Sequence, residues 1–182
     1  GQTRAANYDG LIDALYENGK VTTTIGGNKL WVPWYDRSDS CELANLKGGK
    51  SCNSGTTIDF THNCMVTDEF SQVGVLVAMG THQVRMDEFS NTVTAIASTN
   101  GGIPAWRIYR NGDTMEACRS GINGNCDTAS DATARIIIAL YTAAKNPAFS
   151  ANTRTDYLNK ANTLASAMLT YEVDQTCRPS SV

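Results

Sequence analysis

Two adjacent amphipathic patterns of helical period near the end of the chain constrain the fold more than any other sequence feature. The first spans 128–145 and stops at Asn146-Pro147, because proline disfavours a helical residue before it. The second spans 152–173. Each places its apolar residues on one face: Ala132, Ile136, Ala139, Leu140 and Ala143 in the first, and Leu158, Ala161, Leu164, Ala165, Met168 and Leu169 in the second. The short link between them predicts an antiparallel helical hairpin.

Two segments further upstream have the same period. Residues 5–18 are followed by Gly19, in the position of a C-terminal helix cap, and residues 84–98 are followed by Asn100-Gly101-Gly102. Their apolar positions are Tyr8, Leu11, Leu15 and Tyr16 in the first segment, and Met86, Phe89, Val93, Ile96 and Ala97 in the second. The chain is therefore predicted to be mainly α, built from antiparallel helical hairpins.

Residues 66–80 fit two structures. Val73, Val75 and Val77 alternate as in a strand, whereas Phe70, Val73 and Val77 also share one helical face. Thr67 is followed by two acids, which the helix dipole stabilises in a first turn, and this favours a helix.

Two other regions, 20–64 and 102–127, are rich in glycine and turn residues. They are longer than the roughly 2–8 residues that connect helices in a plain bundle, and long loops on a helical scaffold often carry the functional site. The first reads as a loop or insertion with room for a small β-hairpin. The whole chain, 1–182, has the length of a single domain.

Six cysteines lie mostly in these loop-like regions, at Cys41, Cys52, Cys64, Cys118, Cys126 and Cys177. Their even number predicts disulfides and an extracellular location, and a first residue other than Met fits a trimmed N-terminus. Proximity suggests Cys41–Cys52, Cys118–Cys126 and Cys64–Cys177. No CxxC pair occurs, and His62 and His82 do not complete a ligand set, so no metal site is predicted.

Charge and motif content exclude several functions. The formal net charge is -3, which leaves no basic excess for nucleic acid or an anionic membrane. No apolar run is long enough to span a bilayer. The GxSxG, P-loop and GxGxxG patterns are absent, and no cofactor is predicted.

Three acids begin predicted helices: Asp68 and Glu69 at one, Asp131 at another. If both helix ends face one cleft, they supply the pair of carboxyl groups that glycoside hydrolysis needs. The alternative is that these acids only cap their helices and interact with the helix dipoles.

Aromatic and basic residues precede Asp131. Trp106 and Tyr109 can stack on sugar rings, or the tryptophan can fill a gap beneath a loop. Arg107 can bind an acidic sugar or pair with a nearby acid. Asp131 and Arg135 are spaced for an i,i+4 ion pair on a helix.

Taken in order, these segments resemble family 8 glycoside hydrolases, which are (α/α)6 barrels. V-T-D-E-F-S-Q-V-G-V-L-V-A-M (66–79) resembles the family's S-E-G-Q-G-Y-G-M-L-I-A, with Glu69 and Gly74 on its glutamate and last glycine. M-D-E-F (86–89) follows, then I-P-A-W-R-I (103–108) on L-M-A-W, and A-S-D-A-T-A-R-I-I-I-A-L (129–140) on A-T-D-A-D-L-D-I-A-Y-A-L. Residues 157–173 fit the next helix, and 8–20 the opening one.

The resemblance implies about half of a toroid, acting on a β-linked polysaccharide as part of an inverting endo-glycosidase. Glu69 would be the general acid, Asp131 would position the sugar, and Trp106 would stack on it, with Asp68, Arg107 and Tyr109 nearby. Phe70, Val73 and Thr133 depart from the motif. The family's base lies in the other half, so a second chain or copies of this one would cover the open face. The alternative is a non-catalytic structural, assembly or glycan-binding protein.

Overall fold

The computed structural model describes residues 7, 9–13, 20–25, 28–33, 53–54, 57–58, 64–98, 100–111, 114–116 and 128–172. Within these ranges the fold is mainly helical, and residues 9–13 are helical as well. The four long helices are α3 (Thr67–Met79), α4 (Gln83–Ser98), α5 (Ser130–Lys145) and α6 (Ala151–Tyr171). The helical interpretation of 66–80 is confirmed, and the other three helices lie within two residues of the predicted bounds.

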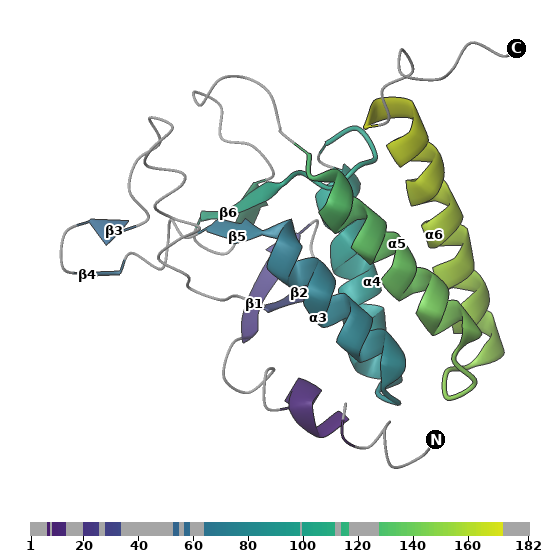
Figure 1. The fold of residues 1–182 in the computed structure, drawn as a ribbon. Coiled ribbons are helices and arrows are strands. Elements are labelled where there is room, and N and C mark those ends of the chain that lie inside the picture. The colour runs from purple at the N-terminus through teal and green to yellow at the C-terminus, as the bar shows by residue number, and fades with distance from the viewer. Residues whose placement is uncertain are drawn as a thin grey trace, which may run out of the picture.

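The helices form two antiparallel hairpins, α3–α4 and α5–α6, which lie side by side in the same orientation (Figure 1). The starts of α3 and α5 are joined by Arg135, whose guanidinium pairs with Asp68. Their ends are joined by Asn146, which donates to the carbonyl of Ala78. The second helix of each hairpin is aligned in the same way. Tyr157 near the start of α6 donates a hydrogen bond from its hydroxyl to Asp87 near the start of α4. Thus α3 runs parallel to α5, and α4 parallel to α6.

The core lies between the helices and also takes in Ile12 from the N-terminal helical residues. Phe70 and Phe89 stack with ring centroids 4.6 Å apart, and Phe149 meets Tyr157 edge-on at 5.9 Å. The apolar positions predicted for α4 and α5 are all buried. In α6 the prediction holds only in part: Ala161 and Leu164 are buried, whereas Leu169 is 54% exposed. Tyr157, which the predicted face did not include, is buried as well.

A hairpin of β1 (Lys20–Ile25) and β2 (Asn28–Pro33) confirms the small β-hairpin expected within 20–64. A shorter antiparallel pair, β3 (Asn53–Ser54) and β4 (Thr57–Ile58), lies in the same region.

A three-stranded sheet corrects the sequence interpretation. β5 (Cys64–Val66), β6 (Arg107–Asn111) and β7 (Thr114–Glu116) form an antiparallel sheet in the order β5-β6-β7. The interpretation of 102–127 as loop is therefore wrong for β6 and β7. Gly112 and Asp113 stand between these strands in the sequence, and such a pair is a hairpin turn signal, but each strand is too short to show clear alternation.

Candidate functional site

Three segments that are far apart in sequence meet at the N-terminal ends of α3 and α5. β5 runs directly into α3, and the first helical residue, Thr67, donates to the Trp106 carbonyl from its backbone nitrogen (3.0 Å) and its hydroxyl (3.2 Å). Just before Trp106, Ala105 forms an antiparallel bridge with Thr128, two residues ahead of α5. The sheet and this bridge therefore hold the Trp106 segment against both helix starts.

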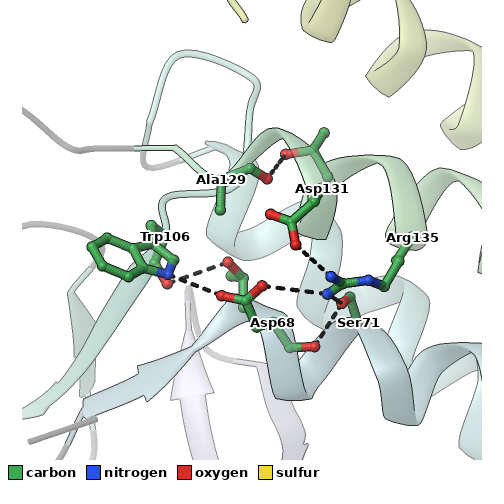
Figure 2. A network of polar contacts seen from close by, with 8 residues as sticks. Asp68, Ser71, Trp106, Ala129, Asp131 and Arg135 are labelled. Carbon is green, nitrogen blue, oxygen red and sulfur yellow. Dashed lines mark hydrogen bonds and ion pairs between the residues drawn. The ribbon is translucent and has the colours of Figure 1, made fainter.

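Asp68 lies at the centre of this corner (Figure 2). Its Oδ2 accepts a hydrogen bond from Trp106 Nε1 at 3.0 Å, and its Oδ1 pairs with Arg135 Nη1 at 3.3 Å. The same Nη1 donates to Ser71 Oγ at 3.3 Å, and the Ser71 hydroxyl donates to the Asp68 carbonyl at 2.7 Å. The Asp68 side chain thereby fixes the Trp106 ring relative to α3.

Asp131 joins the network from the first turn of α5, because Arg135 Nη2 donates to its Oδ2. The i,i+4 pair expected from the sequence is confirmed. One guanidinium therefore serves two carboxylates, and the formal charges of the three groups sum to one negative charge. Asp131 is 62% exposed, against 32% for Asp68, so Asp131 retains acceptor positions open to an external donor.

The same acids also fit the alternative role, in which they only cap their helices and interact with the helix dipoles. Asp68 and Asp131 both sit in first turns, where the helix dipole favours a negative charge. The Arg135 pairs are partly exposed, and such pairs contribute at most about 1 kcal/mol to stability. The network thus holds side chains in place more than it holds the fold together.

Thr133, which departs from the family motif, is buried. It is 1% exposed, and its hydroxyl lies 3.1 Å from both the Ala129 carbonyl and Glu172 Oε1. This side chain faces the interior and does not contact a ligand at the surface.

Other predicted site residues are described only through their backbone. Glu69 lies in the first turn of α3, while Arg107 pairs with Val66 and Tyr109 with Cys64 across β5 and β6. Their side chains, and Cys41, Cys52, Cys118, Cys126 and Cys177, lie outside the described residues. The structure therefore brings together Asp68, Trp106 and Asp131 of the predicted set.

Two residues at the corner were not predicted as part of the site. The sequence indicates Arg135 only as the i,i+4 partner of Asp131, and no pattern in it points to Ser71. The i,i+4 spacing reveals the first contact of Arg135, but its contact with Asp68 joins residues 67 positions apart and depends on how α3 packs against α5.

No protein-family model matches the chain, and no curated protein matches it at a significant level. Among the described residues, no group of three or more His, Cys, Asp and Glu side chains is arranged to hold a metal ion. No helix in the described part of the chain is long and apolar enough to cross a membrane.

Proposed function

We propose that this chain is a glycan-binding domain of the glycoside hydrolase type, with its site at the N-terminal ends of α3 and α5. The observation that supports this most is the convergence of Asp68, Trp106 and Asp131, from three distant segments, in one partly exposed network. An indole ring beside oriented carboxylates is the combination that binds a sugar, because the ring covers its apolar face and the acids accept its hydroxyl protons.

The roles follow from exposure and bonding. Asp131, the more open acid, accepts a hydrogen bond from a sugar hydroxyl while Arg135 holds it in place. Asp68 orients Trp106 through the indole nitrogen, so that the ring presents a fixed face for stacking. Arg107 and Tyr109 follow Trp106 directly in β6 and belong to the same proposed site.

Cleavage needs more than this corner. We assign Glu69 as the general acid, and a further segment or chain supplies the base that activates water. In an inverting enzyme the two carboxyl groups stand roughly 6.5–9.5 Å apart, which leaves room for that water. Two hairpins with α3 parallel to α5 fit the repeating unit of an (α/α)6 toroid, which supports this arrangement. An extracellular location follows from the proposed substrate and the proposed disulfides.

Binding is tested by calorimetric titration with cello-, xylo- and chito-oligosaccharides. The Asp131→Asn variant is expected to bind about 10-fold more weakly, because a neutral amide replaces the charged acceptor. Asp156→Asn on α6 is the matched control: it removes one carboxylate that is 55% exposed and paired i,i+4, and it should leave affinity unchanged. If none of these oligosaccharides binds, or if both variants weaken binding equally, the proposed site is wrong.

Catalysis is tested separately with Glu69→Gln. If the native assembly cleaves a β-linked polysaccharide, this variant should lose nearly all cleavage and keep its affinity for oligosaccharides, since the amide cannot donate the proton. Unchanged cleavage would remove Glu69 from the mechanism without affecting the binding proposal.

A non-catalytic structural or assembly protein is the second candidate, and one observation favours it. α5 exposes large apolar side chains, with Ile138 at 54% and Tyr141 at 50%, as expected of a face that another protein covers. Comparing the mass of the native assembly with that of the denatured chains decides between the candidates. A second polypeptide supports a hydrolase completed by another chain. Copies of this chain alone would leave the catalytic base missing, and would support the structural role if no oligosaccharide binds.

A further inference from the structure

The exposed face of α5 forms a continuous stripe along the helix. Its exposed members, Asp131, Ile138, Tyr141 and Lys145, share one side of the helix, and the half-buried Ala134 and Thr142 lie between them on the same side. It lies opposite the buried stripe that packs against α3 and α6, and in Figure 1 α5 runs between these two helices. A stripe of this spacing with an apolar centre is the surface that one helix presents to another.

Charge is distributed unevenly along this stripe. Asp131 lies at its start and Lys145 in its last turn, where the Lys145 amine stands 5.3 Å from the Tyr141 ring centre. Ile138 lies midway between Asp131 and Lys145 in sequence. A second α5 laid antiparallel across the first, with the two-fold axis at Ile138, therefore places Lys145 of each copy beside the other copy's Asp131. Asp131 belongs to a cluster of two carboxylates and one guanidinium, which carries a formal excess of one negative charge.

We propose that α5 is a self-association surface on which a second copy of this chain docks antiparallel. In this dimer Ile138 meets its own counterpart at the axis, and Lys145 faces the partner's Asp131. Tyr141 faces the partner's Arg135, a pairing that suits the ring face and the guanidinium. Ala134 and Thr142 are small enough to let the helix axes approach to about 8–10 Å.

The charge pattern favours a second copy of this chain over a third helical hairpin placed beside the first two in the same orientation. A helix parallel to α5, as α3 is, gains nothing from the acid at one end and the lysine at the other. Antiparallel pairing brings these charges together and also opposes the helix dipoles. A seam of one helix from each copy buries less than about 1,200 Å2, so we expect a weak dimer with a Kd in the micromolar range.

Sedimentation equilibrium of the full chain over a wide concentration range tests the proposal. The wild type should fit a monomer–dimer equilibrium, and Ile138→Glu should raise Kd at least about 10-fold, because it places two like charges at the axis. Val84→Glu is the matched control: Val84 is 66% exposed at the start of α4, and this change should leave Kd unaltered. Circular dichroism checks that both variants remain folded.

A charge exchange tests the antiparallel register. Asp131→Lys and Lys145→Asp should each weaken the dimer several-fold, and the double variant should recover most of the wild-type Kd. Failure of this rescue would exclude the proposed register. A chain that stays monomeric up to about 1 mM, or an Ile138→Glu variant that dimerises like the wild type, would overturn the proposal.

The dimer and the proposed glycan site share Asp131, but they rest on different contacts otherwise, so the two proposals can be tested separately at a residue that only the dimer uses. Ile138→Glu leaves Asp68, Trp106 and Asp131 in place, so loss of dimerisation with unchanged oligosaccharide titration would separate the surface from the site. A different polypeptide found in place of the second copy would also count against self-association, while supporting a hydrolase completed by another chain.

Discussion

At the scale of one residue, Gly74 shows why its position on α3 carries no side chain. A β-carbon built at Gly74 would lie 2.1 Å from Cζ of Phe89, whose ring is fully buried and stacks on Phe70. The absence of a side chain at Gly74 therefore leaves room on α3 for the outer end of the Phe89 ring. The sequence identified the position through its motif, but the reason for it depends on the packing of α4.

Gly74→Ala should therefore destabilise the protein, although alanine favours helix by about 1 kcal/mol over glycine. Overpacking against Phe89 should outweigh that gain and lower the free energy of unfolding by about 1–3 kcal/mol, measured by urea denaturation. Gly10→Ala is the control, because a β-carbon there has no atom within 4 Å. Equal effects of the two substitutions would contradict the close approach of the Phe89 ring.

Tyr157 carries the clearest link between one residue and pH. Burial, and then the 2.6 Å hydrogen bond from its hydroxyl to Asp87 Oδ1, raise the pKa of this tyrosine well above its ordinary value. Above about pH 10 the unfolded chain releases the phenol proton while the folded chain retains it. The stability that this group contributes is therefore complete below about pH 10 and falls as pH rises further.

Tyr157→Phe should lower the free energy of unfolding at neutral pH by about 1.5–3 kcal/mol, because it removes a hydrogen bond to a carboxylate. Part of the decline in stability above about pH 10 should disappear with it. Tyr171→Phe, at a position that is 67% exposed, is the control. The prediction fails if the two variants show the same dependence on pH.

Between elements, Asn146 joins the ends of α3 and α5. Its Nδ2 donates to the carbonyls of Ala78 (3.0 Å) and Gly80 (2.7 Å), and its Oδ1 accepts from the Ala148 nitrogen. The sequence marked Asn146-Pro147 only as the end of a helix. The contacts that make this residue a bridge to α3 come from the tertiary fold.

Asn146→Asp should cost about 2–3 kcal/mol of stability, because a carboxylate has no proton to donate and would face two carbonyl oxygens. Asn162→Asp, on the exposed side of α6, makes the same chemical change and should have little effect. Chemical denaturation of both variants measures the difference. A similar loss in each would show that the Asn146 contacts are not important for stability.

The helices and the sheets were not equally predictable from the sequence. The bounds of the helices follow from the local period of apolar residues. A helix at 67–79 was predictable because Thr67 and the acids after it mark a helix start. The β5–β6 pair joins Cys64 to Tyr109, and no local pattern in such short strands predicts that register. For the same reason the sequence indicated Asp68, Trp106 and Asp131 separately, whereas the Arg135 link between two of them required the packed hairpins.

For the whole molecule, the cysteines provide a test that does not depend on any single pairing. All six are predicted to form disulfides. Alkylation of the denatured but unreduced chain should therefore label none of them, and prior reduction should expose all six to the reagent. Mass spectrometry distinguishes these outcomes, and labelling without reduction would contradict the disulfide prediction.

The contact between Thr67 and Trp106 also sets an order for folding. These residues are 39 positions apart, so joining them directly from the unfolded chain closes a large loop at an entropic cost. Because α4 runs antiparallel to α3, formation of this hairpin returns the chain to the end where α3 began. The corner that holds Asp68 and Trp106 should therefore assemble after the local hairpin, and kinetics measured through Trp106 should report a later step than those measured through helix content.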